Sequence, residues 1–438
     1  MISRNILNYN NIFRLGFCCA MIFVIPIVDS SSNVLSQEKT SVSKENNSPR
    51  NPGGGLTAEQ ISQLEALGYL SGYVPPPEKT NVTIYNKEKA YDGLNFFSSP
   101  HKPSAYIVDM QGNTLHEWSR NIDEVWPEKN FDGVEHTKFW RRVYLYPNGD
   151  LLAIFENIGI VKLDKDSNIL WKNDNRAHHD LEVLENGDIW VLTNKLNSIP
   201  RIAGDVPVQE DYLTLMDQNG KILKEISLLA SIENSEFQSI MKRQMNFKNP
   251  EKQPAFDIFH TNTLEVLDGR VEHILPEFRK GNILTSFRTL DAIAVVDQKS
   301  GLAVWVYQER FRGQHDPKVL ESGNMLLFDN FGSGEASIVL EYSLENMDVV
   351  WSYSGTSESP FYSIGSGTAQ RLLNGNTLIT ETQQGRAFEV TREKEIVWEF
   401  FNPNLVGANK ELIAAIWEMI RIEKTYSLNW INNNARHP

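Results

Sequence analysis

Three histidines are the side chains most able to do chemistry, because they recur at one position of an internal repeat. His179 and His315 each stand eight residues before the turn glycine of an apolar hairpin, and His260 stands nine residues before its own. Arg141 holds the same position in another copy of the hairpin. A single such histidine is more often structural than catalytic, but three in register predict a shared polar site.

The repeat that positions these residues consists of two kinds of hairpin. In the first, two apolar strands flank Asn-Gly or a close relative, and its copies read VYLYPNGDLLAIF, LEVLENGDIWVLT, PKVLESGNMLLFD and AQRLLNGNTLITE. The second has six copies, and most end in tryptophan, at Trp118, Trp171, Trp305, Trp351 and Trp398. Four short strands repeated about every 45 residues are typical of a propeller blade. The sequence therefore predicts an all-β, six-bladed β-propeller.

A propeller would bring the three histidines together, because the innermost strand of every blade begins at the same end of the axial channel. The second strand of each blade returns to that end and adds an arginine and two asparagines. We expect the catalytic residues to be His179, His260, Arg288 and His315. The predicted substrate-binding residues are His178, Asn194 and Asn330, although strand alternation favours a structural role for the first.

Two kinds of site fit this set of side chains. One is a tris-histidine metal site, and the other is an anion site in which a histidine acts as nucleophile or as acid and base. Arg288 favours the anion, because a fixed positive charge is unfavourable beside a dication and because its guanidinium can grip sulfate or phosphate oxygens as a fork. We therefore expect no metal and no other cofactor. The alternative from a different class is a secreted propeller that binds an anionic or aromatic ligand without turning it over.

Charge and the N-terminus bear on the partners and the compartment. The 438 residues carry a net charge of −14, which disfavours nucleic acid as a partner because phosphate binding needs a basic face. Residues 1–30 are typical of a secretory signal, with two arginines before the apolar run LGFCCAMIFVIPIV, which holds both cysteines. We predict a periplasmic or secreted protein, membrane-anchored if the signal stays uncleaved.

The remaining chain is predicted to comprise a linker, the propeller and a tail. Residues 31–80 form a polar linker with capping-box spacing at Thr57 for a short helix. The propeller spans residues 81–402, with a polar, helical insertion at about 230–256 that we expect to form a wall or lid over the channel. Residues 403–438 include NKELIAAIWEMIRIEKTY, whose periodicity predicts a helix outside the ring.

Several of these segments together resemble the bacterial arylsulfate sulfotransferases. The resemblance begins near residue 84 and runs in that family's order through HHDLEVLENGDIW, DIFHTNTLEVL, ILTSFRTLDAIAVVD, GQHDPKVLESGNMLLFDN and GTAQRLLNGNTLI. It implies a six-bladed propeller that moves a sulfuryl group from a phenolic sulfate ester to a phenol through a sulfated histidine, without a nucleotide sulfate donor. His315 is the implied sulfated residue, with His179, His260 and Arg288 binding the sulfate and neutralising the leaving phenolate.

The implied partners are therefore small molecules, a phenolic sulfate donor and a phenol acceptor, and a homo-oligomer is compatible with the sequence. The chain departs from the better-known members in two respects. We expect it to have neither the N-terminal β domain of those members nor, outside the predicted signal, their cysteine pair. These departures bear on the oligomer, on the acceptor and on the activity itself.

Overall fold

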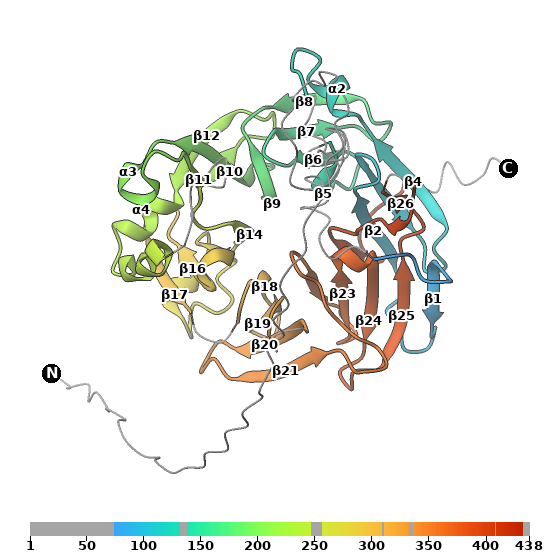
Figure 1. Cartoon of the computed structure of the whole chain (residues 1–438). Coiled ribbons are helices and arrows are strands. Elements are labelled where there is room, and N and C mark those ends of the chain that lie inside the picture. Colours follow the sequence, from blue (N-terminus) through green and yellow to red (C-terminus); the bar gives the residue numbers. More distant parts are fainter. Residues whose placement is uncertain are drawn as a thin grey trace, which may run out of the picture. The chain divides into compact units, whose positions relative to one another are not determined.

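The computed structural model describes residues 74–431 except 132–137, 247–255, 309–310, 333–335 and 408. In this part of the chain, antiparallel strands form six blades around a central axis (Figure 1). The predicted six-bladed β-propeller is confirmed. The predicted signal at residues 1–30 and the predicted helix near Thr57 lie outside the described residues. No helix in the described ranges is long and apolar enough to cross a membrane.

Each blade contains four antiparallel strands, and their order runs from the axis outward. The first three blades are β5 (Trp140–Leu145), β6 (Leu151–Phe155), β7 (Gly159–Leu163) and β8 (Ile169–Asn173); β9 (Ala177–Val183), β10 (Ile189–Asn197), β11 (Val208–Met216) and β12 (Ile222–Ser227); and β14 (Thr261–Val266), β15 (Ile283–Phe287), β16 (Ala292–Val296) and β17 (Ala303–Tyr307). The next two are β18 (His315–Val319), β19 (Asn324–Asp329), β20 (Ile338–Ser343) and β21 (Val349–Ser354); and β22 (Thr368–Arg371), β23 (Thr377–Glu381), β24 (Arg386–Val390) and β25 (Ile396–Phe401).

The sixth blade joins the two ends of the described chain. Its strands are β28 (Met419–Ile422), β2 (Leu94–Ser99), β3 (Ser104–Val108) and β4 (Thr114–Ser119), so the innermost strand comes from the C-terminal tail. In addition, β1 (Asn81–Tyr85) pairs with β25 as a fifth, outermost strand of the preceding blade. Both pairings close the ring with main-chain hydrogen bonds between residues more than 300 positions apart.

The predicted C-terminal helix is wrong. Residues 412–413 form β27 (Leu412–Ile413), which pairs with β26 (Leu405–Val406), and Met419–Ile422 form β28. The sixth blade has only three strands of its own, so its inner position is filled by the apolar tail. Pairing with β2 overrides the helical periodicity of this segment, and the propeller extends to Ile422 rather than ending at residue 402.

The outer hairpins bind neighbouring blades through their tryptophans. Trp118 donates its indole N–H to the carbonyl oxygen of Gly149 in the next blade at 3.1 Å, and Trp398 donates to Met110 at 3.0 Å. Trp171 and Trp351 donate in the same way to Gln218 and Arg392, at 3.0 and 2.9 Å. The repeated tryptophan thus acts between blades: it fills the outer core and satisfies a turn carbonyl of the neighbouring blade.

The tight inner hairpins depend on glycine at the turn. Gly149 and Gly187 have φ values of 90° and 87°, a region that side-chain-bearing residues rarely adopt. Each turn closes with a hydrogen bond from the glycine N–H, at 3.0 Å to Tyr146 and 2.9 Å to Leu184. These turns fix the register of the inner strands. Residues at the same distance before each turn glycine therefore occupy equivalent positions.

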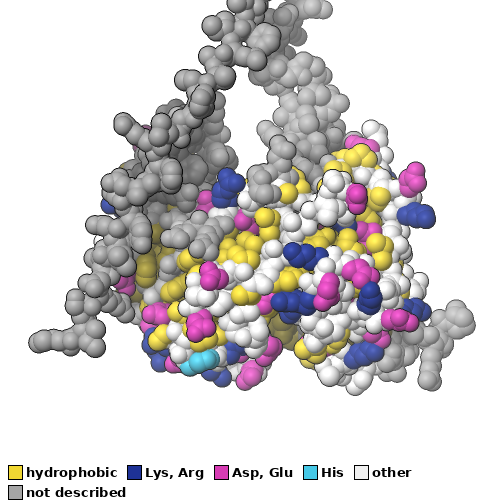
Figure 2. All heavy atoms as spheres, turned by 90° about the horizontal axis from the view of Figure 1, so that it is seen from below, with side chains coloured by type: hydrophobic (Ala, Val, Ile, Leu, Met, Phe, Trp, Pro, Cys, Tyr) yellow, Lys and Arg dark blue, Asp and Glu magenta, His cyan; other side chains and the backbone are white. Residues whose placement is uncertain are grey.

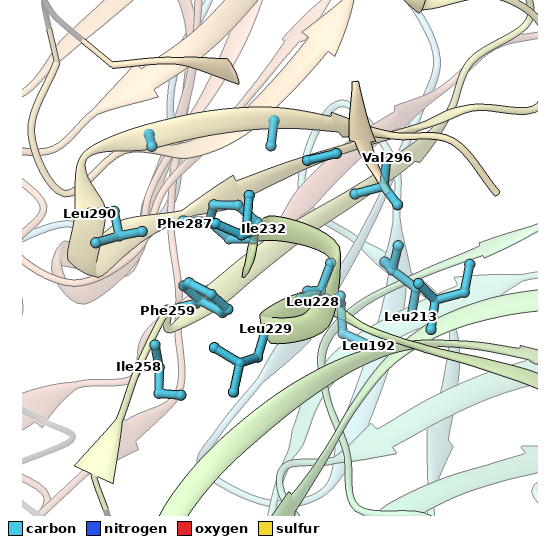
Figure 3. Close-up of a cluster of buried hydrophobic side chains, with 14 of the residues drawn as sticks. Leu192, Leu213, Leu228, Leu229, Ile232, Ile258, Phe259, Phe287, Leu290 and Val296 are labelled. Atoms are coloured by element: carbon cyan, nitrogen blue, oxygen red, sulfur yellow. The ribbon is translucent and has the colours of Figure 1, made fainter. Parts of the chain in front are cut away.

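The insertion packs against the second and third blades. Its described part is helical, as predicted, with α4 (Leu228–Glu233) capped by Ser227 and followed by the 3-10 helix η2 (Gln238–Asn246). Leu228, Leu229 and Ile232 of α4 lie in a buried apolar cluster with strands of both blades (Figure 3). The described part of the insertion is therefore anchored to the second and third blades through α4. Its second helix, η2, contacts the short 3-10 helix η5 (Arg288–Leu290).

The other short elements lie in loops. They are α2 (Ile122–Val125), α3 (Pro200–Ala203), β13 (Phe256–Asp257), η4 (Pro276–Phe278) and η6 (Thr382–Gln384). β13 pairs in parallel with the start of β11, which fixes Asp257 beside the second blade. On the side of the molecule shown in Figure 2, acidic and basic side chains of the described residues are interspersed and gather into no extended basic patch.

Side chains on the inner strands also link adjacent blades around the channel. Asp180 on β9 accepts the N–H of Leu264 on β14 at 2.9 Å, and Asp316 on β18 accepts that of Ala369 on β22 at 3.1 Å. A cavity of about 900 Å³ opens beside the ends of these strands, and its lining includes Lys318 but none of the histidines. The histidines lie at the strand starts.

Candidate active site

The inner strands are irregular where the predicted site residues lie. The pairing register shifts between Thr261 and Thr263 on β14 and between His315 and Lys318 on β18. His179 on β9 and His260, just before β14, have φ values of 51° and 48°. Such left-handed residues are unusual outside glycine, and bulges of this kind re-aim side chains toward a site. The backbone here is shaped to direct the histidines rather than to extend the ladder.

His179 and His260 meet edge to face across two adjacent blades. Their ring centroids are 5.0 Å apart with an interplanar angle of 75°. His178 also joins this group, since its Nδ1 lies 2.9 Å from Nδ1 of His179. His178 and His179 are both buried. Regular strand alternation would point His178 and His179 to opposite faces. Their rings meet because the chain bulges at His179.

His315 has one ring nitrogen held and the other available. Its Nδ1 lies 2.6 Å from Oδ1 of Asn330 and 3.0 Å from the carbonyl oxygen of Gly313. The Asn330 amide nitrogen donates to the carbonyls of Ser363 and Ser366 at 2.7 and 2.9 Å, which fixes the oxygen toward His315. Both neighbours of Nδ1 are acceptors, so Nδ1 carries the proton. Nε2 then presents a lone pair, and this buried atom has no hydrogen-bond partner in the described chain.

Burial and nearby arginines keep His179 and His315 neutral. Burial lowers the pKa of His315 well below its usual value, and the positive charge of Arg288 lowers it further. Burial also lowers the pKa of His179, with Arg141 as the next cause. Neutral imidazole is the nucleophilic form, so His315 is ready to react at neutral pH.

His260 has a carboxylate partner. Its Nδ1 lies 2.7 Å from Oδ2 of Asp257, whose other oxygen accepts the His260 main-chain N–H at 2.7 Å. Burial raises the pKa of Asp257, but the charge and hydrogen bonds of His260 outweigh it and hold the pKa below its ordinary value. The pair therefore combines an ionised carboxylate with a histidine that is one-third exposed. The only indication of Asp257 in the sequence was its position three residues before His260.

Arg288 brings to the site a positive charge that no ion pair with the described residues neutralises. It lies at the end of β15, where the strand passes into η5. Its Nε is buried with no hydrogen-bond partner, and its side chain makes no ion pair with the described residues. Burial lowers its pKa, against the opposing charges of Asp257 and Asp291. A partly buried guanidinium whose Nε lacks a partner is suited to an anionic ligand.

Arg141 is a second arginine beside the histidines. Its guanidinium lies 4.4 Å from the ring of Trp417 and 3.3 Å from the hydroxyl of Ser366, and its Nε is 3.7 Å from Glu156. The repeat register placed Arg141 in the histidine position, but no role followed from the sequence. Trp417 was missed because it lies in the tail that was predicted to be helical. The indole N–H of Trp417 is buried with no hydrogen-bond partner among the described residues.

The two predicted asparagines differ in what they contact. Asn330 holds His315, whereas Asn194 accepts from Arg176 Nε at 2.8 Å and donates to Asn157 at 2.6 Å. The hydrogen bonds of Asn194 thus join the first and second blades. Within the described ranges, no group of three or more His, Cys, Asp or Glu side chains is arranged to hold a metal ion.

Comparison with known proteins identifies the family. The family model described as Arylsulfotransferase (ASST) matches residues 142–403, more than half of the chain. The chain belongs to the arylsulfotransferase family. This membership confirms the resemblance seen in the sequence and supports sulfotransferase activity in general.

The chain was also compared with curated proteins and with solved structures. No curated protein matches the chain. Among solved structures, a protein of unknown function from Bacteroides caccae has a TM-score of 0.43 at 12% identity, covering 71% of this chain and 94% of its own. A streptogramin B lyase has a TM-score of 0.39 at 12% identity, covering 80% of this chain and 95% of its own. The Dos1 propeller has a TM-score of 0.40 at 12% identity, covering 77% of this chain and 76% of its own.

Proposed function

We propose that this arylsulfotransferase transfers a sulfuryl group from a phenolic sulfate ester to a phenol by way of a sulfated His315. One observation supports this most directly. His315 Nε2 is buried with no hydrogen-bond partner among the described residues, and Asn330 holds the ring in the tautomer that leaves the Nε2 lone pair free. A neutral, oriented imidazole whose surroundings include the partly buried Arg288 suits attack on an anionic ester.

In the first half-reaction, His315 Nε2 attacks the sulfur atom. A nitrogen–sulfur bond forms, the bond from sulfur to the aryl oxygen breaks, and the phenolate leaves with the electron pair. Negative charge moves onto that oxygen and remains on the sulfuryl oxygens. Arg288, His260 and His179 supply the cationic and N–H donors that stabilise it. In the second half-reaction, the oxygen of a deprotonated acceptor phenol attacks sulfur and the nitrogen–sulfur bond breaks.

Arg288 also supports an anion in preference to a tris-histidine metal site. A dication would add to a positive charge that already lies near His315, whereas a sulfate ester would neutralise it. No nucleotide is required as sulfate donor in this scheme, and no cofactor takes part. We further propose that the N-terminal segment directs export, which would give the enzyme access to phenolic substrates outside the cytoplasm.

The decisive experiment is to trap the intermediate. Purified protein is incubated with 4-nitrophenyl sulfate alone, and acid-labile sulfate is located by peptide mass spectrometry. Label on the peptide that contains GQHDPKVL is expected, and addition of phenol should discharge it into phenyl sulfate. Activity that persists after exhaustive chelation would separate this reaction from a metal-dependent one. Label on AHHDLEVL instead would reassign the nucleophile to the second blade.

A further inference from the structure

A buried chain of polar side chains leads away from His179 into the second blade. His178 Nδ1 lies 2.9 Å from His179 Nδ1, and the opposite nitrogen of His178 faces Asp211 Oδ1 at 3.6 Å. These two facing atoms are both buried, and each lacks a hydrogen-bond partner among the described residues. Polar atoms rarely remain unpaired in a protein interior without a reason.

We propose that Asp211 and His178 form a proton relay behind His179, which gives a proton to the leaving phenolate and recovers one from the acceptor phenol. This inference rests on the proposed function. His179 is the residue that touches the substrate, and Asp211 and His178 act through it. Facing atoms that are slightly too far apart for a hydrogen bond in the free protein are typical of catalytic contacts that tighten when substrate binds.

The proposed relay places its protons in one consistent starting arrangement. In the substrate complex, before the phenolate leaves, Asp211 is protonated and its O–H donates a hydrogen bond to His178 Nε2. His178 Nδ1–H donates to His179 Nδ1, and His179 Nε2 carries the proton for the leaving group. When the phenolate leaves, each proton moves one place and Asp211 becomes a carboxylate. The acceptor phenol then returns a proton to His179 Nε2, and the relay resets with no net change.

The surroundings of Asp211 favour this role. Burial and then the negative charge of Asp257 raise its pKa to about 7, so it can both hold and release a proton near neutral pH. One of its oxygens is fixed by the main-chain N–H of Thr261 at 3.0 Å. The titratable and charged groups that face the relay are Arg141, Glu156, Arg176, Asp257, His260 and His315.

The reaction needs such a proton because phenols are weak acids. An unsubstituted phenol has a pKa near 10, like the tyrosine side chain, so its phenolate is a poor leaving group at neutral pH unless it is protonated as it departs. A nitrophenolate is far less basic and can leave without a proton. The leaving group therefore reports whether the relay is used.

The test compares wild type with Asp211→Asn and His178→Gln, which keep the size of each side chain. Single-turnover sulfation of His315 is measured with a series of substituted phenyl sulfates. Both variants should lose about 100-fold with phenyl sulfate and remain within about 2-fold with 4-nitrophenyl sulfate. The rate should thus depend more steeply on the basicity of the leaving group. Asp188→Asn, in the β9–β10 turn, controls for the loss of one negative charge in the same blade.

The outcomes separate the relay from the reaction. Equal losses with both donors would show a structural role for Asp211 and His178, and unchanged rates would show that neither is used. A steeper dependence in Glu156→Gln alone would place the proton path through Glu156, which lies 3.5 Å from His179 Nδ1. Any of these overturns the relay while leaving a sulfated His315 intact. If the wild type gains no label on His315, the proposed function itself fails.

Discussion

Asn330 holds His315 by a hydrogen bond of 2.6 Å between its side-chain oxygen and Nδ1 of the imidazole. The amide cannot turn over without losing its two bonds to main-chain carbonyls. The sequence predicted a substrate-binding role for Asn330, which stays a prediction; in the structure its polar atoms contact His315 and the main-chain carbonyls of Ser363 and Ser366. These contacts orient the ring of His315, the proposed nucleophile.

Replacing Asn330 by aspartate should change the pH dependence of sulfation. A carboxylate beside Nδ1 favours the protonated imidazole, so the pKa of His315 rises and the acid limb of the rate profile moves to higher pH. The rate with donor alone, measured between pH 4 and 8, shows the shift. Asn194→Asp supplies the comparison, because Asn194 bonds to Arg176 and Asn157 rather than to His315. An acid limb that stays in place in Asn330→Asp contradicts the orientation assigned to this pair.

Removal of Arg288 should act on both the rate and the acid limb. Arg288→Gln removes a donor to the sulfate and should lower kcat about 100- to 1000-fold. The arginine also lowers the pKa of His315, so its loss should move the acid limb upward. In the wild type, the neutral nucleophile should persist well below pH 6.5, the ordinary histidine value. A fall in rate with no shift of the limb would limit Arg288 to substrate binding.

The tryptophan contacts between blades should contribute measurable stability. Trp351→Phe keeps an aromatic ring but removes the N–H that bonds to Arg392, and we expect a loss of about 1–3 kcal/mol in the free energy of unfolding because a carbonyl loses its partner. Urea unfolding followed by circular dichroism measures the loss. Trp305→Phe is the matched variant, since no such bond is made by Trp305 among the described residues. Comparable losses in both would point to packing alone.

Glu265 in the channel should make stability depend on pH. Burial raises its pKa from 4.5 to about 7 in the folded chain, where it accepts the Val319 N–H at 3.0 Å. A raised carboxyl pKa means that the folded state holds the proton more tightly, so this contribution is present below pH 4.5 and is lost as pH rises through about 7. Glu265→Gln should therefore gain stability relative to wild type between pH 5 and pH 8, in urea titrations. A difference that does not change with pH would contradict the assignment.

The turn glycines and alternating strands made the blade architecture readable from the sequence. Gly149 and Gly187 adopt the backbone angles that their hairpins require, and these angles depend only on residues next to them in the chain. The same local register placed His179, His260 and His315 at the strand starts. Because the period of a strand is two residues and the turn fixes its origin, counting along the sequence was enough to select these three.

Local sequence patterns did not predict the strands whose partners are far away in the sequence. The apolar residues of 412–422 fit a helix by periodicity, and only the empty inner position of the sixth blade makes Met419–Ile422 a strand. No spacing in the chain indicates that β2 lacks an inner partner. The same applies to β1, whose partner β25 lies at the other end of the propeller.

The sequence by itself determined which residue types gather at the strand starts, and the tertiary structure decided what each can do. Whether His315 presents Nδ1 or Nε2 depends on Asn330, and the orientation of the His260 ring depends on Asp257, on a strand that pairs with the second blade. The approach of Arg141 to Trp417 requires closure of the ring. Hydrogen-bond direction, burial and the charge of neighbours are properties of three-dimensional surroundings, because they arise from contacts between segments that the order of residues does not reveal.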